Sequence, residues 1–252
     1  MSKTLAIMNQ KGGAGKTTTA EALAAGLTLK GYSVLAVDLD AQCNMSYTAR
    51  AKTDGATALG VLTGEIRAGD AIQHTGSGDI IPASKALAGA DAFITDTGKE
   101  YRLREALEPI SGGYDYIVLD TPPHLGILTV NALTACDGVI IPTVADIYSL
   151  QGIEQLAETM KPVKKYCNPA LSIEGILLTR YSPRSIVSRE VAELAGRIAA
   201  KLGTRLFRAT IREAVAVREA QISQQDLFHY APRAKVTEDY ARFIAELLGE
   251  ES

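Results

Sequence analysis

The sequence is short of cysteine and of long apolar runs, and each shortage excludes a class of protein. Three isolated cysteines, Cys43, Cys136 and Cys167, argue against a disulfide framework or a CxxC zinc site. No apolar run approaches the roughly 18 to 20 residues that cross a bilayer. The N-terminus also lacks the long apolar segment and small-residue cleavage site of a signal peptide. We therefore expect reduced thiols in a cytoplasmic protein with no membrane partner.

The remaining composition is that of an ordinary globular protein. The chain has 252 residues, of which 46% are hydrophobic and 22% charged, which is enough for one large α/β domain with a substantial core. It shows no internal repeat, low-complexity tract or linker. We therefore expect residues 1–252 to form a single domain.

Charge is spread unevenly along the chain. The formal net charge is −3, but residues 180–218 carry nine basic and three acidic side chains, so the rest of the chain carries −9. This asymmetry indicates either one basic face on an acidic body or an ordinary solvated helix face. The charge pattern alone leaves both interpretations open.

Apolar, strand-like runs alternate with helical patterns from one end of the chain to the other. Several runs are apolar on both faces, as expected for strands of a buried parallel sheet. We predict an α/β fold with a mostly parallel, twisted sheet and helices on both faces. The predicted strands are 4–9, 33–39, 79–83, 114–120, 137–144, 171–179 and 204–209. The clearest helices are 17–30, 149–165, 185–202 and 236–248, and the irregular segment 45–78 is expected to hold short helices.

A glycine-rich loop, QKGGAGKTT, joins the first predicted strand to the first helix. This strand–loop–helix order is the context that a phosphate-binding loop requires. Its glycines let backbone N–H groups converge on phosphate oxygens, and the helix N-terminus adds its positive dipole end. We expect Lys16 to reach the β- and γ-phosphates and Thr17 to bind Mg²⁺. The predicted nucleotide-binding residues are Lys11, Gly12, Gly13, Ala14, Gly15, Lys16, Thr17 and Thr18.

The loop departs from the general Walker A pattern by carrying a second lysine. Lys11 precedes the glycines, so the motif reads K-G-G-x-G-K-T-T, the deviant Walker A box of a P-loop NTPase fold. In this feature the chain resembles the ParA/MinD family of ATPases. The family's signature lysine stands at the position of Lys11 and reaches across a dimer interface to the phosphates held by the partner subunit. The resemblance therefore implies a homodimer, ATP and Mg²⁺, with Lys11 and Lys16 both catalytic.

Carboxylates follow two of the predicted strands. Asp38 and Asp40 end the second strand in VDLDAQCN, and Asp120 ends YDYIVLD. If the second strand continues to Asp40, both of its aspartates point the same way, and the carboxyl ends of parallel strands face the phosphate crevice. The resemblance places Asp38 near the Mg²⁺ water shell and gives Asp40 the catalytic role of positioning the attacking water. Asp120 would hold Mg²⁺ through water, in the manner of a Walker B residue.

The resemblance to the ParA/Soj branch covers almost the whole chain. The segments 125–156 and 173–191 are similar to ParA sequences, and YAPRAKVTEDY (230–240) is similar to a Tyr-Asp-Pro-Arg motif of the family. Ala41 and Cys43 stand where the family usually has proline and glycine. Arg212 stands where it usually has proline beside the adenine pocket, which leaves the base contacts open.

Other branches of the superfamily are disfavoured by physical features. The cysteines do not fall in the motifs of nitrogenase-type iron proteins or iron–sulfur carriers. The acidic C-terminal tail would be repelled by an anionic membrane, unlike the basic amphipathic helix of MinD. The tyrosines do not cluster as in bacterial tyrosine kinases of this fold, and the loop begins too early for an N-terminal helix-turn-helix domain. Single histidines are expected to have no role, and His74 and His229 to have no nearby partners.

The ParA resemblance gives the basic segment a function. It implies non-specific DNA binding by an ATP-bound dimer on the nucleoid, with hydrolysis stimulated by a ParB-like partner, and such binding needs only phosphate neutralisation. The predicted DNA-binding residues are Arg184, Arg205, Arg208, Arg233 and Lys235, with Arg218 a further candidate. The alternatives are a positioning ATPase for a protein cargo, such as a chemoreceptor array or microcompartment, and a metabolic ATPase that amidates or ligates a small molecule.

Overall fold

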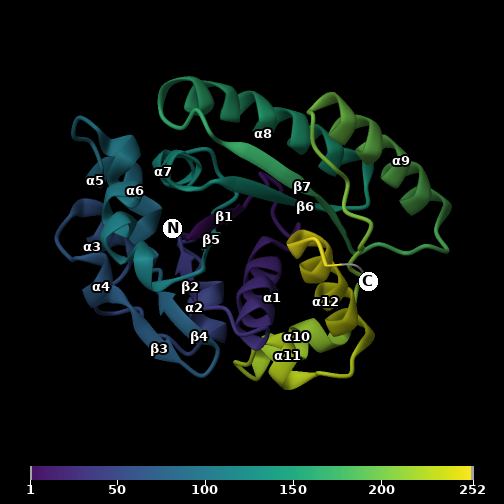
Figure 1. Ribbon diagram of the computed structural model, residues 1–252, viewed down its shortest axis with the longest axis horizontal. Helices are drawn as coiled ribbons and strands as arrows, with labels where there is room; N and C mark the ends of the chain where they lie inside the picture. The colour runs from purple at the N-terminus through teal and green to yellow at the C-terminus, as the bar shows by residue number, and fades with distance from the viewer. Residues whose placement is uncertain (1, 251–252) are drawn as a thin grey trace.

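Seven strands form one twisted sheet at the centre of the protein (Figure 1). The computed structural model describes residues 2–250, apart from the side chains of residues 147 and 148. The strand order is β3-β4-β2-β5-β1-β6-β7, and every neighbouring pair except β3–β4 is parallel. The strands are β1 Lys3–Ile7, β2 Val34–Asp38, β3 Gln73–Thr75, β4 Gly78–Ile81, β5 Tyr116–Asp120, β6 Gly138–Val144 and β7 Ser172–Thr179. The prediction of a mostly parallel sheet is confirmed.

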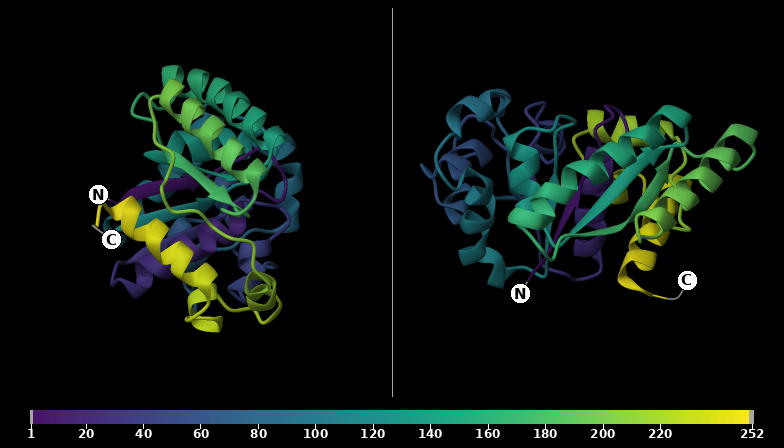
Figure 2. Two further views of the ribbon diagram at one scale, coloured as in Figure 1. Left: turned by 90° about the vertical axis from the view of Figure 1, so that its right-hand side faces the viewer. Right: turned by 90° about the horizontal axis from the view of Figure 1, so that it is seen from above.

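Helices cover both faces of the sheet (Figures 1 and 2). One face is covered by α3 Ala58–Thr63, α6 Arg102–Leu107, α7 Ile127–Ala135, α8 Ile147–Tyr166 and α9 Ile186–Lys201. The other is covered by α1 Lys16–Leu29, α10 Val215–Ile222, α11 Leu227–Tyr230 and α12 Lys235–Leu248. Short helices α2 Asn44–Thr48, α4 Ala68–Ala71 and α5 Ala90–Phe93 lie in the connections, with 3-10 turns at Lys85–Gly89, Lys99–Tyr101 and Glu108–Gly113.

The alternation of side chains along each strand divides the core in two. On β1, Leu5 and Ile7 face the layer of α1 and α12, whereas Ala6 and Met8 (just past its end) face the layer of α7 and α8. All four side chains are almost completely buried. A strand that is apolar at successive positions is therefore explained by helices on both sides of a parallel sheet.

Two details of the sheet differ from the sequence prediction. Residues 204–209 form no strand and make only an isolated bridge, between Leu206 and Ile176 of β7. The reason is that the next backbone donors, the amides of Arg208 and Ala209, bind the Glu246 carboxylate on α12 at 2.9 Å each instead of continuing a ladder. The second difference is β3, a three-residue strand in the segment 45–78, which also contains the expected short helices.

The last helix, α12, is tied to the protein through a buried carboxylate. Asp239 is 2% exposed and accepts hydrogen bonds from Arg212, at 2.5 Å from Nε and 2.8 Å from Nη2, and from Arg242. Burial raises the pKa of Asp239, but the hydrogen bonds from Arg212 outweigh it and hold the pKa below its ordinary value. Beside this cluster, the Tyr240 hydroxyl lies 3.4 Å from Thr19 Oγ1, so α12 packs against α1.

No helix within residues 2–250 combines the length and the apolar character needed to cross a membrane.

We expect Asp239→Asn to lower the free energy of unfolding by about 2 kcal/mol at pH 7, because a buried charged acceptor of two arginines is lost. Since the pKa of Asp239 is lowered on folding, its stabilisation is present above the ordinary pKa and is lost as the pH falls through the folded-state pKa. Urea denaturation followed by circular dichroism should show a gap between wild type and variant that narrows below about pH 4.

The matched control is Asp96→Asn, which breaks an ion pair with Arg102 at a carboxylate whose side chain is 78% exposed. This variant should unfold almost like the wild type because exposed ion pairs contribute little. Equal losses in the two variants would contradict the role assigned to Asp239.

Candidate functional site

The glycine-rich loop lies between β1 and α1 and has the conformation that only glycine adopts freely. Gly13 and Gly15 have φ angles of 74° and 87°, in the left-handed region. Gly15 immediately precedes α1, and a Cβ atom there would lie 3.5 Å from the side chain of Thr179. The loop therefore presents its backbone at the N-terminus of α1, where N–H groups and the helix dipole favour an anion.

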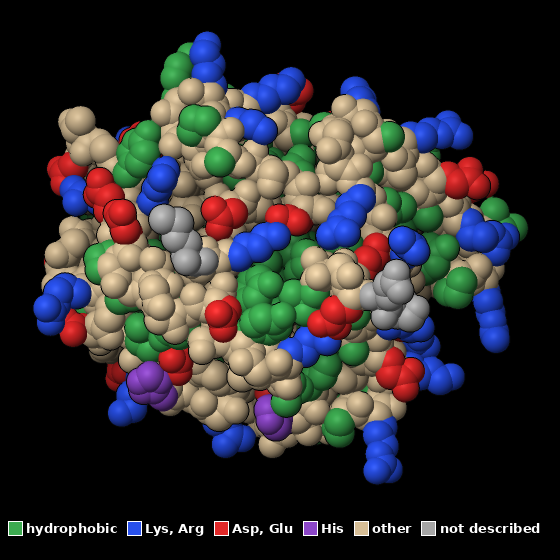
Figure 3. Space-filling view, viewed as in Figure 1, with side chains coloured by type: hydrophobic (Ala, Val, Ile, Leu, Met, Phe, Trp, Pro, Cys, Tyr) green, Lys and Arg blue, Asp and Glu red, His purple; other side chains and the backbone are tan. Residues whose placement is uncertain are grey.

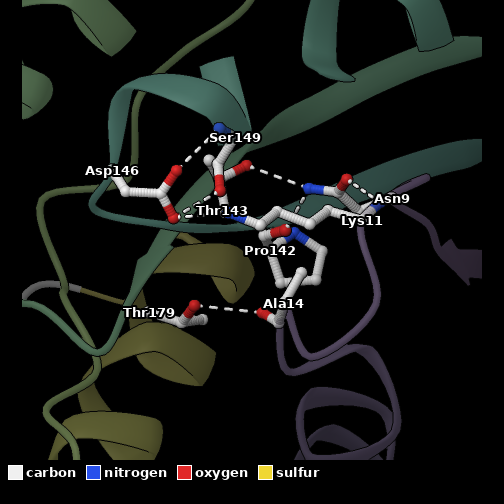
Figure 4. A network of polar contacts seen from close by, with 8 residues as sticks. All are labelled: Asn9, Lys11, Ala14, Pro142, Thr143, Asp146, Ser149 and Thr179. Carbon is white, nitrogen blue, oxygen red and sulfur yellow. Dashed lines mark hydrogen bonds and ion pairs between the residues drawn. The ribbon is translucent and has the colours of Figure 1, made fainter. Parts of the chain in front are cut away.

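Side chains from outside the loop hold it in place (Figure 4). Asn9, 1% exposed, donates from Nδ2 to the carbonyl of Pro142 on β6 at 2.7 Å and accepts the amide of Lys11 on Oδ1 at 2.9 Å. Thr179, at the end of β7, donates to the carbonyl of Ala14 at 3.0 Å. The loop is thus attached to two neighbouring strands. Sequence reasoning missed Asn9 and Thr179, since their only signal is a polar residue at the end of a buried strand.

A cavity of about 680 Å³ opens above the loop. Its walls come from the loop, from the segment after β2 and from α10, which contributes Arg218, and Arg180 also lines it. Of the residues predicted to bind nucleotide, it is lined by Gly12, Gly13, Gly15, Lys16, Thr17 and Thr18. Lys11 and Ala14 are outside this lining: Ala14 is buried beneath the loop, and the Lys11 side chain points elsewhere.

Lys16 is a buried cation in the lining of the cavity. It is 7% exposed. Burial lowers the pKa of its ammonium group, while the charges of Asp120 and Asp40 act in the opposite direction. Lys16 therefore lies close enough to Asp120 and Asp40, two of the three predicted carboxylates, to interact with their charges. A lysine that is partly desolvated interacts more strongly with an anionic ligand than an exposed one does.

Asp38 is already supplied with donors by the protein. It ends β2 directly opposite Asp120 of β5 and is fully buried. Its Oδ2 accepts from the amide and hydroxyl of Ser46, at 2.9 and 2.7 Å, and its Oδ1 accepts from the amide of Asp40 at 3.0 Å. Burial raises the pKa of Asp38 to about 6, against the opposing effect of the Ser46 hydrogen bonds. Ser46, which sequence reasoning missed, thereby ties α2 to the site.

Asp120, unlike Asp38, has no hydrogen-bond donors among the described residues. Both of its carboxylate oxygens are shielded from solvent, and neither has a hydrogen-bond partner within the described part of the chain. Burial raises the pKa of Asp120 well above its ordinary value, the charge of Asp38 adds to this effect, and Thr17 opposes it. A buried carboxylate without donors beside a threonine hydroxyl fits a hard divalent cation bound through water.

Residues 2–250 contain no group of three or more His, Cys, Asp or Glu side chains arranged to hold a metal by themselves. A cation at Asp120 would therefore take further ligands from water or from a bound phosphate, as Mg²⁺ does in proteins that bind nucleotides.

Asp40 lines the cavity from a turn and not, as expected, from the end of a strand. β2 ends at Asp38, so Asp40 lies in the following turn, where its Oδ1 accepts the amide of Gln42 at 3.0 Å. It still lines the cavity. Cys43, two positions beyond Ala41, has a φ of 55°, a conformation that glycine adopts freely and cysteine does not. The departure at Cys43 therefore places a strained residue in the turn that carries Asp40.

The side chain of Lys11 forms an ion pair with Asp146, the residue just before α8 (Figure 4). Its Nζ lies 2.7 Å from Oδ2 of Asp146, which also caps α8 by accepting the amide of Ser149 at 2.9 Å. Burial acts to raise the pKa of Asp146, but Lys11 and Ser149 outweigh it and lower the pKa. Sequence reasoning gave Asp146 no role, although an aspartate just before a helix is a usual N-cap.

A smaller cavity of about 110 Å³ adjoins the first and shares Gly15, Thr18, Arg180 and Arg218 with it. Arg180 has a φ of 50°, which is strained for a residue with a side chain. Arg212 lines this smaller cavity while its guanidinium group is held by Asp239. Arg212 thus lies beside the loop, and its ion pair keeps its charged end occupied.

All the basic residues predicted to bind DNA are exposed. They are Arg184, Arg205, Arg208, Arg233 and Lys235. Figure 3 shows Lys and Arg side chains around all margins of one face and near its centre, with acidic side chains among them. Positive charge on this face is therefore distributed over a broad area.

Four of these basic residues lie at opposite ends of α12, whereas Arg184 lies between β7 and α9. Arg233 and Lys235 stand at its beginning, whereas the amide of Arg208 binds Glu246 near its end. Arg205 is three residues from Arg208 in the same segment. Its guanidinium group lies 4.6 Å from the ring centre of Phe207. At 1.5 Å of rise per residue the two groups are about 16 Å apart along the helix.

Two of the three histidines have partners that sequence reasoning did not expect. His74 Nδ1 lies 2.6 Å from Asp79, and His229 Nδ1 lies 2.6 Å from Asp226. The expectation of no nearby partner was wrong because His74 and Asp79 meet across the β3–β4 hairpin and His229 follows the N-cap of a short helix.

The chain is similar to known proteins along its whole length. A family described as an AAA domain matches residues 2–173. The sporulation initiation inhibitor protein Soj of Bacillus subtilis is 38% identical, over 98% of this chain and 98% of its own. The chromosome partitioning protein ParA of Caulobacter vibrioides is also 38% identical, over 99% of this chain and 95% of its own. Among solved structures, cobyrinic acid a,c-diamide synthase from Mycobacterium smegmatis with bound ADP and magnesium has a TM-score of 0.85 and 32% identity, over 98% of this chain and 94% of its own.

We expect Asn9→Ala to loosen the loop, because the amide of Lys11 loses its acceptor and the link to Pro142 disappears. The Lys11 amide should exchange its hydrogen about tenfold faster, the equivalent of one lost hydrogen bond. Hydrogen exchange followed by NMR measures this.

Asn131→Ala is the matched control, since the Oδ1 of buried Asn131 accepts the amide of Leu103 at 3.0 Å in another part of the fold. That variant should accelerate exchange at Leu103 and leave Lys11 unchanged. Acceleration at Lys11 in both variants would show a general loss of stability and refute the local role of Asn9.

Proposed function

The chain belongs to the ParA/Soj family of P-loop ATPases, and from this we propose that it is a Mg²⁺-dependent ATPase whose ATP-bound dimer partitions DNA. The relatives named Soj and ParA match it over nearly their full length, which supports one conserved unit along residues 1–252. A single seven-stranded sheet that draws strands from residue 3 to residue 179 also supports a single domain.

The observation that carries the proposal is the divergence of the two loop lysines. Lys16 lines the cavity above its own loop, whereas Lys11 lies outside that lining with its ammonium group on Asp146. A cation needed for phosphates in its own cavity would be expected to point into it. We infer that Lys11 leaves Asp146 to serve phosphates held by a second copy of the chain, as an arginine finger does.

The residues of the cavity supply the remaining parts of phosphoryl transfer. The backbone of residues 12–18 would bind the phosphates, and Lys16 would stabilise negative charge on the β- and γ-phosphates. Thr17 and Asp120, with Asp38 behind them, would hold Mg²⁺, which supplies charge stabilisation when bound. Asp40 would position the water that attacks the γ-phosphate. Intrinsic hydrolysis should be slow because the dimer must form before both lysines are in place.

The exposed basic residues support non-specific DNA binding by the dimer. Neutralisation of backbone phosphates requires no base-reading motif, and dimerisation doubles the number of arginines on one assembly. A ParB-like partner would stimulate hydrolysis and release the DNA, which gives a cytoplasmic protein associated with the nucleoid. The same cycle would serve a protein cargo if the adaptor were not a DNA-binding protein.

A second candidate is an ATPase that amidates a small molecule. It is favoured by one observation, the structural likeness to the protein named cobyrinic acid a,c-diamide synthase. The two candidates differ in what stimulates them: the partition ATPase should turn over faster with DNA and its adaptor, whereas a synthase should need neither.

We expect Lys11→Ala to bind ATP with nearly the wild-type Kd and to remain monomeric, because Lys16 and the loop backbone are intact while the lysine reaching the second copy is lost. Isothermal titration gives the Kd, and light scattering in ATP gives the mass. Lys30→Ala, which removes an ion pair between α1 and Glu250, is the control and should dimerise normally. A Lys11→Ala variant that dimerises with ATP would disprove the exchange between subunits.

Retention on DNA should require ATP and should weaken steeply with salt, since the logarithm of the binding constant falls by about 0.9 per neutralised phosphate for each unit of log salt. Arg233→Ala should weaken binding to all sequences alike and flatten this slope by about 1 per contact. Lys52→Ala, at an exposed lysine near β3, is the matched control. Binding that is indifferent to salt would refute recognition of the DNA backbone.

A further inference from the structure

The segment 121–126 joins Asp120, at the end of β5, to the start of α7 and has no part in the scheme above. Its first residue, Thr121, is fully buried and donates from its hydroxyl to the carbonyl of Ile7 on β1 at 2.8 Å. Pro123, two residues further on, lines the 680 Å³ cavity above the phosphate loop. The segment therefore runs from the carboxylate that is proposed to hold Mg²⁺ to the wall of the cavity.

The other end of the segment is held by a side chain from a distant part of the chain. Asp91, on α5, accepts the amide of Ile127 on its Oδ1 at 2.9 Å. Ile127 is the first residue of α7, and Gly126 before it has no side chain to cap the helix. The Asp91 carboxylate thus replaces an N-cap at the start of α7, where an acceptor and a negative charge are both favourable.

The helix that carries Asp91 is anchored in the hydrophobic core. Ala90 and Ile94, on either side of Asp91 in the sequence, are both buried. They belong to the same apolar cluster as Ile127, the residue whose amide Asp91 binds. The amide of Ile94 also donates to the carbonyl of Ala90 at 2.9 Å. Packing on both sides of the contact therefore sets the position of Asp91 relative to α7.

A close approach between Asp91 and Gly126 makes this contact sensitive to a single methyl group. A Cβ atom at Gly126 would lie 2.8 Å from Oδ2 of Asp91 and 3.3 Å from its Oδ1. The φ of Gly126 is −121°, a value that residues with side chains adopt without strain. The need for glycine here thus comes from the Asp91 carboxylate and not from the backbone. We expect Gly126→Ala to displace this carboxylate from the amide of Ile127.

We propose that Asp91 is a positioning residue for ATP hydrolysis, which holds the far end of the segment that begins at Asp120 and passes the cavity. The inference rests on the proposed function in one respect, that the cavity binds and hydrolyses ATP. Asp91 is not among the residues that line the cavity and acts through Ile127. The phosphate loop has separate anchors, Asn9 and Thr179. Loss of the Asp91 contact should therefore slow hydrolysis and leave ATP binding intact.

The experiment measures the kcat of ATP hydrolysis with Mg²⁺ and the Kd of a fluorescent ATP analogue in a series of variants. Asp91→Ala should lower kcat about tenfold, the equivalent of one lost hydrogen bond, with a nearly unchanged Kd. Asp91→Asn keeps an acceptor oxygen and should recover most of kcat. Hydrogen exchange at the Ile127 amide should be faster in Asp91→Ala than in Asp91→Asn.

A double variant tests whether Gly126 and Asp91 act through one contact. Gly126→Ala alone should lower kcat as much as Asp91→Ala does. Because Asp91→Ala removes the atoms that the new Cβ would meet, the double variant should match Asp91→Ala and not multiply the two losses. Two controls should hydrolyse ATP like the wild type. They are Gly112→Ala, where a Cβ atom would meet nothing within 4 Å, and Asp70→Ala, which breaks an exposed ion pair with Arg67.

The outcomes separate this proposal from the one on which it rests. Wild-type kcat in Asp91→Ala, or losses that multiply in the double variant, would refute the positioning role. A matching loss of kcat and of ATP affinity would refute it too, since it would show a general disturbance of the site. Thermal unfolding establishes that each variant is folded. A wild-type protein that binds no ATP would overturn both proposals. Wild-type hydrolysis without dimerisation, slowed tenfold in Asp91→Ala, would contradict the proposed dimer and support the role of Asp91.

Discussion

Two aspartates that face each other across neighbouring buried strands constrain the whole site. Asp38 and Asp120 pair in register at the carboxyl ends of β2 and β5, and both are fully buried. Like charges in such a position disfavour ionisation unless donors or cations compensate them. Asp38 obtains its donors from Ser46 and from the turn after β2. Asp120 obtains none from the described residues, so Lys16 and an external cation are the remaining sources of compensation.

Asp38 has hydrogen-bond donors and Asp120 has none among the described residues. The ionisation of the two carboxyl groups therefore depends on the positions of the elements that supply these donors. Because Ser46 belongs to α2, the hydrogen bonds that stabilise Asp38 also hold that helix against the sheet. Glu21 approaches the same region from α1 as a further acid. A ligand that brings phosphates and a divalent cation changes the balance for all three carboxyl groups at once. The elements that hold them are then expected to respond together to the ligand.

The loop is held by contacts that leave its first lysine free to move. Asn9 and Thr179 fix the backbone on either side of the glycines, so the phosphate-binding conformation exists before any ligand arrives. The side chain of Lys11 is held by an ion pair with Asp146 in which both side chains are about one-third exposed. An ion pair with that much solvent contact is weak enough to exchange for a doubly charged phosphate. The structure of a single chain is therefore compatible with a lysine that acts on another.

The sequence by itself determined the sheet type, the loop and the identity of its lysines and carboxylates. These depend on local patterns: apolar runs of strand length, glycines before a lysine, and acids after buried strands. It did not reveal Asn9, Ser46, Asp146 or Thr179 as partners, because each acts on a residue supplied by another element or another turn of the chain. It also placed a strand at 204–209, where the decisive factor is a carboxylate on α12. Only the tertiary structure decided which carboxylate is satisfied and which is left without donors, since that depends on the meeting of α2 with β2 and leaves no trace in the spacing of the acids.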